Sequence, residues 1–112
     1  MNRDKNLPLT ETAYYVLLAV KEPAHGYVIM QKVEELSDGQ VRLAAGTLYG
    51  AVENLLGKGL ITSVPSSDVR RKVYAISEKG EQTLRADYQR MAHMMRVTDM
   101  VLGKGTNKDE KV

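Results

Sequence analysis

Apolar residues recur at helical spacing through the first half of the chain. Residues 14–20 form an uninterrupted apolar run behind Thr10, whose hydroxyl suits a helix N-terminus, and they predict a first helix buried on most sides. Residues 26–36 and 46–58 each place apolar side chains three and four positions apart, which predicts a second and a third helix. Gly59 stands where a helix commonly ends in a left-handed residue.

The spacing changes from helical to alternating in the next segment. Residues 60–64 and 71–76 have strand character and flank the turn-forming sequence Pro-Ser-Ser-Asp, so they predict a two-stranded ribbon. Ser77 then suits the N-cap of a long last helix over residues 78–102. Three short helices closed by a ribbon follow one another in the order of a winged helix-turn-helix.

We therefore predict a mainly α fold of the α+β type with three parts. A winged helix-turn-helix domain occupies residues 1–77, a dimerisation helix residues 78–102, and a disordered tail residues 103–112. The charged segment of residues 1–6 is expected to fray, as chain ends commonly do.

The last predicted helix has an apolar seam that its own domain is too small to cover. A helix of about 25 residues, at about 1.5 Å each, spans nearly 40 Å, so its far half extends beyond the domain. A second copy of the helix is the simplest cover, and we predict a homodimer. The alternative is a helix folded back as ordinary core, but little chain remains to cover it. The seam follows a heptad repeat and comprises Leu84, Tyr88, Met91, Met95, Thr98 and Leu102.

The amino-acid composition limits the kinds of binding or catalytic site that the chain can form. The 112 residues include 16 Lys and Arg against 14 Asp and Glu, a net charge of +2, so a polyanion must be met by a local basic patch. The lack of cysteine in the sequence excludes disulfides, a thiolate nucleophile and cysteine-ligated metals. No catalytic or metal-binding pattern surrounds the two histidines, so we predict no enzyme, metal site or cofactor. No apolar run reaches membrane-spanning length, and we expect a cytoplasmic protein.

The third predicted helix and the ribbon carry the residues suited to DNA. In a winged helix, the third helix enters the major groove while the ribbon reaches the nearby backbone. Small residues on the leading face let the helix approach closely, and the hydroxyls of Thr47 and Tyr49 can bond phosphates or base edges. Arg70, Arg71 and Lys72 form a cationic cluster at the ribbon turn. The predicted recognition-helix set is Arg42, Ala45, Gly46, Thr47, Tyr49, Gly50 and Asn54, of which Arg42 can join the ribbon cations.

Each of these residues also has a purely structural interpretation. Thr47 can cap its helix, Tyr49 can pack inward, and a short basic run is commonly a solvated surface. It is the combination of all of them in one compatible fold that favours DNA binding.

Five short motifs follow one another over about residues 7–102. They are the residues 9–18, His25-Gly26-Tyr27, Gly46-Thr47-Leu48-Tyr49, Gly59-Leu60-Ile61 and Arg71-Lys72-Val73-Tyr74. Together they resemble the PadR family of bacterial transcriptional regulators, and the length is similar to the short class with a single dimerising C-terminal helix. The resemblance implies a homodimeric repressor on a pseudo-palindromic double-stranded DNA operator.

The resemblance also assigns expected roles to residues. It implies that Gly46, Thr47 and Tyr49 contact DNA, that Leu48 faces the core, and that Tyr27 contacts the DNA backbone or packs. The Arg70, Arg71 and Lys72 cluster matches the wing of the family.

The chain departs from the family pattern at several positions of the third helix. Ala44 stands where a Ser or Thr cap is common, Gly50 where a proline is common, and Glu53 and Asn54 where basic residues are common. Because phosphates would repel Glu53, DNA contact shifts toward the N-terminal turn and the wing.

Short PadR-like regulators can bind flat hydrophobic or cationic compounds beside their last helix. In some members a tryptophan sandwiches the ligand, and this sequence has none. Thioethers adapt to varied ligands, although packing in the dimer is the favoured role of a methionine stripe at heptad spacing. Asp87 and Asp99 are expected to be solvated. The candidate pocket consists of Tyr88, Met91, Met94 and Met95.

Two classes of function fit these features. The first is a sequence-specific transcriptional regulator, a repressor relieved by a small hydrophobic or aromatic ligand. The alternative is a protein-binding adaptor that uses the winged-helix fold and offers its apolar last helix to another protein.

Overall fold

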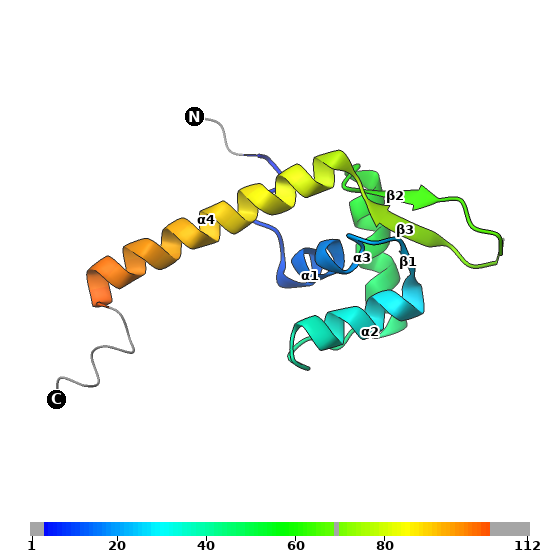
Figure 1. Ribbon diagram of the computed structural model, residues 1–112, viewed down its shortest axis with the longest axis horizontal. Helices are drawn as coiled ribbons and strands as arrows, with labels where there is room; N and C mark the ends of the chain where they lie inside the picture. Colours follow the sequence, from blue (N-terminus) through cyan, green and yellow to red (C-terminus); the bar gives the residue numbers. More distant parts are fainter. Residues whose placement is uncertain (1–3, 69, 104–112) are drawn as a thin grey trace.

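The computed structural model describes residues 4–68 and 70–103 and shows the predicted winged helix-turn-helix (Figure 1). Within these residues, three helices and a small antiparallel sheet form a head, from which a fourth, long helix projects. The elements in chain order are α1 (Glu11–Ala19), β1 (Ala24–His25), α2 (Gly26–Leu36), α3 (Ala45–Gly57), β2 (Ile61–Val64), β3 (Val73–Ile76) and α4 (Glu78–Leu102).

The helix ends follow local signals in the sequence. Thr10 Oγ1 accepts a hydrogen bond of 3.0 Å from the Ala13 N–H before α1, and Ser77 Oγ accepts one of 2.9 Å from the Gly80 N–H before α4. Gly59 follows α3 with a φ of 74°, the left-handed conformation predicted for it. Caps and turn residues act within a few positions, which is why the sequence alone located these boundaries closely.

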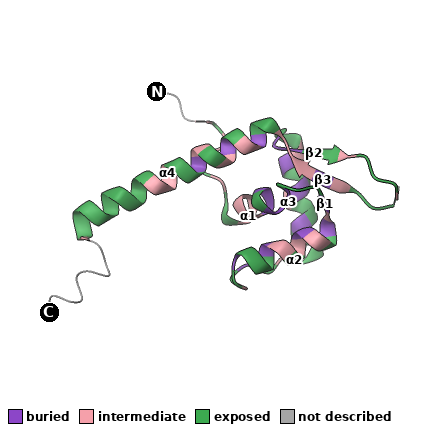
Figure 2. Ribbon diagram, in the orientation of Figure 1, coloured by how far each residue is buried: buried purple, intermediate pink, exposed green. Residues whose placement is uncertain are grey.

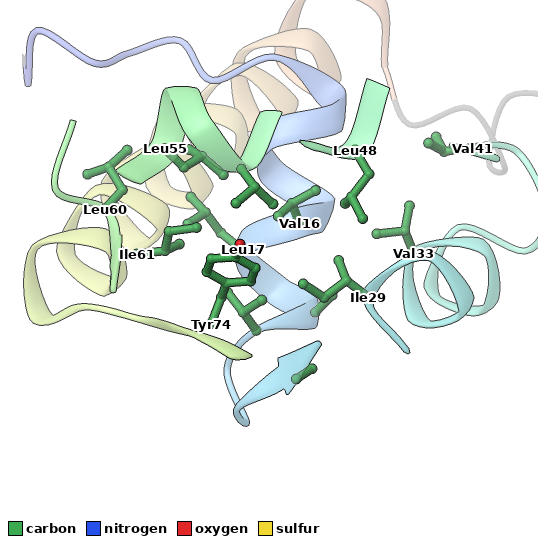
Figure 3. Packing of buried hydrophobic residues seen from close by; sticks show 14 residues of the cluster. Val16, Leu17, Ile29, Val33, Val41, Leu48, Leu55, Leu60, Ile61 and Tyr74 are labelled. Atoms are coloured by element: carbon green, nitrogen blue, oxygen red, sulfur yellow. The ribbon is translucent and has the colours of Figure 1, made fainter. Parts of the chain in front are cut away.

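The core surrounds α1 (Figure 3). Val16 and Leu17 are fully buried, and side chains from α2, α3 and the sheet pack around them. Leu48, expected to face inward from α3, is also fully buried, which confirms that expectation. Each such side chain contributes about 1.5–3 kcal/mol through burial, so this core fixes how the three helices stand relative to one another.

The sheet is larger than the predicted two-stranded ribbon. β3 pairs with β2 along one edge, where Ile61 faces Ile76, and with β1 along the other, where His25 faces Val73. β1 is only two residues long and cannot display an alternating pattern. Its pairing arises because the core brings the chain after α1 beside β3, where the Ile76 N–H also donates to the Val20 carbonyl at 2.9 Å.

The first half of α4 packs on the head, and the second half leaves it (Figure 2). Gly80, Thr83 and Asp87 are buried, whereas every residue from 93 to 102 is exposed. At Gly80 the helix approaches the backbone so closely that a Cβ would overlap the carbonyl oxygen of Leu60. The prediction that the head cannot cover the far half of this helix is therefore confirmed.

The N-terminal segment is more ordered than predicted. Asp4 Oδ2 accepts a hydrogen bond of 2.7 Å from Thr83 Oγ1, and Asp4 Oδ1 accepts one of 2.8 Å from the Asn6 N–H. These two bonds, the backbone bond first, lower the pKa of Asp4. The expectation of fraying is thus wrong for residues 4–6, because α4 supplies a buried hydroxyl for Asp4 to bind.

Two predicted segments lie partly outside the described residues. Fraying of residues 1–3 and disorder of residues 104–112 fall there. Gly103, the first residue of the predicted tail, follows α4 with a φ of 76°. Within the part of the chain that the structure describes, no helix is both long and apolar enough to cross a membrane.

Candidate nucleic-acid interface

One side of α3 presents an open stripe to solvent. Thr47, Gly50 and Asn54 follow one another at spacings of three and four residues, so they share one side of the helix, and all three are exposed. Ala45 is exposed at the start of the helix. A Cβ added at Gly46 or Gly50 would meet nothing within 4 Å. A bulky partner can therefore approach the backbone of α3 closely along this stripe.

Beside this stripe lies a groove of about 700 Å³, here called the wing groove. It is lined by residues from the start of α2, from α3, and from the sheet with the loop before β3. Tyr49 is 47% exposed, and its hydroxyl lies against Gly26, where a Cβ would overlap it. Tyr49 therefore neither packs wholly inward nor points freely into solvent. The predicted contact residues gathered in the groove are Tyr27, Tyr49, Arg70, Arg71 and Lys72.

The three wing cations have different partners. Arg70 Nε lies 3.5 Å from Asp68 Oδ1 and Arg71 Nη1 lies 3.1 Å from His25 Nε2, whereas Lys72 forms no ion pair with any residue that the structure describes. The alternating pattern predicted that Arg71 and Lys72 lie inside the second strand. In the structure they precede β3, which begins at Val73. From this loop both residues line the wing groove.

Besides Asp68, which pairs with Arg70, one acidic side chain belongs to the described lining of the wing groove. Glu53 is exposed on α3 and lines the wing groove one turn after Tyr49. Burial raises the pKa of the nearby Tyr74 hydroxyl, and the charges of Tyr49 and Glu53 raise it further. An anionic ligand in the groove would meet this carboxylate, so the cations of the loop must outweigh it.

Two details of the sequence interpretation differ from the structure. Arg42 lies outside the wing groove, with its Nε 3.3 Å from Glu34 Oε2 of α2, so it does not join the wing cations. Thr47 does not cap α3, because the helix already begins at Ala45 and Ala44 occupies the N-cap position. α3 starts without a side-chain acceptor there, and its first turn has no acidic residue.

The sequence interpretation missed His25. It names this residue within a motif but assigns it no role, whereas the structure puts it in the wing groove, in contact with Arg71. The contact joins residues 46 positions apart and depends on the pairing of β1 with β3. No local pattern in the sequence predicts that pairing. The local signal for His25 is its position directly before the predicted second helix.

A second groove, of about 500 Å³, lies between α1 and α4 and is here called the α1–α4 groove. Of the four residues predicted for a ligand pocket, Met91 lines it, together with Leu9, Tyr14, Tyr15 and Leu18. Tyr88, Met94 and Met95 do not line it and are exposed.

Asp87, at the edge of this groove, is buried rather than solvated as expected. Its carboxylate accepts a hydrogen bond of 3.3 Å from the Leu9 N–H and one from Arg90 Nε. Burial raises the pKa of Tyr14 on the facing helix, and the charge of Asp87 adds to the effect. Across the described residues, no cluster of three or more His, Asp or Glu side chains is arranged to hold a metal ion.

The fold, the free face of its third helix and the basic wing together define a winged helix-turn-helix protein. The family model described as "Transcriptional regulator PadR-like family" matches residues 16–86, more than half of the chain, and the chain belongs to this family. Its members are transcription regulators rather than enzymes, and membership implies DNA binding.

Solved structures agree with this assignment. The chain is 26% identical to a PadR family transcriptional regulator from Eggerthella lenta, over 81% of this chain and 80% of that one, with a TM-score of 0.67. A PadR family regulator from Clostridium difficile is also 26% identical, over 81% and 98%, with a TM-score of 0.65. A transcriptional regulator from Clostridium thermocellum shares the fold at 20% identity, over 88% and 97%, with a TM-score of 0.70. None of the curated proteins matches the chain significantly.

Proposed function

We propose that the protein is a dimeric, cytoplasmic transcriptional repressor that binds a two-fold symmetric DNA site and is released by a small hydrophobic or aromatic ligand. In this proposal the exposed stripe of α3 enters the major groove, and the wing contacts the flanking phosphates. The observation that carries it is the gathering of Tyr27, Tyr49 and the three wing cations in one groove beside that stripe.

The exposed half of α4 supports the dimer. Met95, Val101 and Leu102 are 68%, 75% and 71% exposed in the single chain. Apolar side chains repeated along one helix form a patch that soluble proteins normally cover. Leu84 already packs against the head, so the intermolecular seam begins near Tyr88. Two copies joined there carry two recognition helices related by two-fold symmetry, as binding to a two-fold symmetric DNA site requires.

The decisive experiment is selection of bound sites from random-sequence DNA. The proposal expects a motif with two-fold symmetry, whose half-sites lie about one helical turn apart or a multiple of it. An asymmetric motif would contradict binding by a symmetric dimer with one recognition helix from each copy. No enrichment at all, together with capture of another protein by α4, would instead support the adaptor.

Two sets of variants separate backbone contact from base reading. Neutralising Arg70, Arg71 and Lys72 together is expected to weaken binding to all sequences alike and to lower its salt dependence. Thr47→Ala, on the exposed stripe of α3, is expected to change the selected motif instead. An unchanged affinity in the triple variant would contradict the role of the wing.

The α1–α4 groove supports relief by a ligand. It is framed by Tyr14, Tyr15, Leu18 and Met91, which suits a flat apolar molecule, while Asp87 is already engaged by Arg90. Neutral aromatic compounds are expected to bind the free protein in calorimetry and to release it from DNA. Leu18→Lys changes the α1 wall of the groove, outside the dimer seam, and should abolish both effects and leave DNA binding without the compound intact. Ligand binding that survives Leu18→Lys would place the ligand elsewhere.

A further inference from the structure

Arg71 contacts His25 in the wing groove. Its Nη1 lies 3.1 Å from Nε2 of the imidazole, which belongs to the last residue of β1, directly before α2. His25 also pairs with Val73 of β3, so the ring and the loop that carries Arg71 are held by the same sheet. The contact thus connects the wing to the start of the helix-turn-helix.

The chemistry of the two groups determines the state of the imidazole. A guanidinium has only donors and remains protonated at neutral pH, so it cannot accept a hydrogen bond. Nε2 of His25 is therefore the acceptor, and the neutral ring carries its proton on Nδ1. Among the described residues, no other hydrogen bond to this ring occurs. The remaining titratable groups of the groove are Tyr27, Tyr49, Glu53, Arg70, Lys72 and Tyr74.

The neighbouring cations are held in other ways. Arg70 is paired with the carboxylate of Asp68, so part of its charge is already balanced within the loop. Lys72 has no ion-pair partner among the residues that the structure describes. Arg71 alone is held by a neutral acceptor, which fixes the side chain and leaves its positive charge unbalanced.

We infer that His25 is a positioning residue for DNA binding, because it holds the Arg71 guanidinium in the wing groove and leaves the other N–H groups of the guanidinium available to one phosphate. The inference rests on the proposed function, since it requires the wing groove to face DNA. A free arginine loses much rotamer freedom when it binds, and one that is already fixed loses less. His25 therefore increases affinity without touching DNA.

The tautomer of His25 is the first test. The chain has two histidines, and His93, in the exposed half of α4, serves as an internal reference. At about pH 8, nitrogen NMR of the imidazoles should find the proton of His25 on Nδ1. Arg71→Ala should shift the signals of His25 and leave those of His93 unchanged. A proton on Nε2 of His25 in the wild-type protein would overturn the inference.

The second test is affinity for a random-sequence DNA duplex at low ionic strength. His25→Leu removes the acceptor and should weaken binding about three- to tenfold, as expected when one long side chain must be immobilised on binding. His25→Gln places an amide oxygen within reach of Arg71 and should restore affinity to about twofold of wild type or better. In an Arg71→Ala background, His25→Leu should have no further effect.

The outcomes separate a positioning role from other roles. If His25→Leu weakens binding equally with and without Arg71, or if His25→Gln is as weak as His25→Leu, the ring acts on its own and the inference is wrong. Thermal melting of each variant shows whether the fold is retained. If Arg71→Ala and Lys72→Gln also leave binding unchanged, the proposed function of the wing fails. If those two weaken binding and His25→Leu does not, this inference alone fails.

Discussion

Replacing Met95 and Leu102 together by lysine is expected to leave the head folded and to convert the dimer into a monomer. Both side chains belong to the predicted seam, and at 68% and 71% exposure they contribute little to the core of their own chain. In the proposed dimer, the partner helix covers them. The substitutions therefore act on association and not on the fold.

The size of the effect follows from these exposures. Covering a side chain that is about two-thirds exposed yields about 1–2 kcal/mol, out of roughly 1.5–3 kcal/mol for full burial of Met or Leu. A dimer holds two copies of each residue, so the loss is about 4–8 kcal/mol, or roughly three to six orders of magnitude in the dissociation constant. Enclosing unpaired ammonium groups adds a cost of the same sign.

Sedimentation equilibrium at micromolar concentration measures the result directly. The matched control replaces Gln89 and Met100 by lysine, which adds the same charge about 140–160° around α4 from Leu102, at about 100° per residue. Met100 is 82% exposed, and the control should keep the dimer mass. Helix content by circular dichroism should be similar in both. A seam variant with the wild-type mass, or a control that dissociates equally, would refute the assignment of this face.

Three further variants test the site and its supports. Glu53→Gln removes the carboxylate of the wing groove and should raise affinity for random DNA a few-fold in fluorescence anisotropy; no change would mean that Glu53 points away from phosphates. Gly80→Ala pushes α4 off the Leu60 carbonyl and should cost about 1–3 kcal/mol or more, seen as a lower melting temperature in calorimetry; an unchanged value would show that the helix shifts freely. The pKa of Asp4 is lowered in the folded state, so its stabilisation is present above its ordinary pKa of 3.8 and lost as pH falls below it. Wild type should therefore melt higher than Asp4→Asn at about pH 6, with a gap that closes in acid; a gap independent of pH would exclude the charge as its cause.

The candidate interface shows which contacts a local pattern can anticipate. Tyr49 and the wing cations are readable from short motifs, and the structure gathers them in one groove. Arg42 is equally basic, yet it pairs with Glu34 on α2 outside that groove. Arg42 has no neighbouring cation in the sequence, whereas Arg71 lies between Arg70 and Lys72. That Arg42 stays outside the groove, however, depends on how α2 and the wing are placed around α3.

Asp87 on α4 is a second residue whose surroundings cannot be predicted from the local sequence. On heptad spacing alone it is a polar residue beside an apolar seam, expected in solvent. In the structure, the segment before α1 packs over Asp87. The buried carboxylate accepts hydrogen bonds from the Leu9 N–H and from Arg90. Whether a residue on a helix is solvated depends on which other segment packs over it. For Asp87 that segment lies far away in the sequence.

The sequence by itself determined the number of helices, their caps at Thr10 and Ser77, the length of α4 and its surplus of apolar side chains. These features depend on hydrogen bonds and periodicities that act over a few residues. Only the tertiary structure decided that a two-residue β1 joins the sheet, that residues 4–9 lie along α4, and that His25 meets Arg71. Those contacts form because burial of the core around α1 brings distant segments together, and burial is a property of the whole chain.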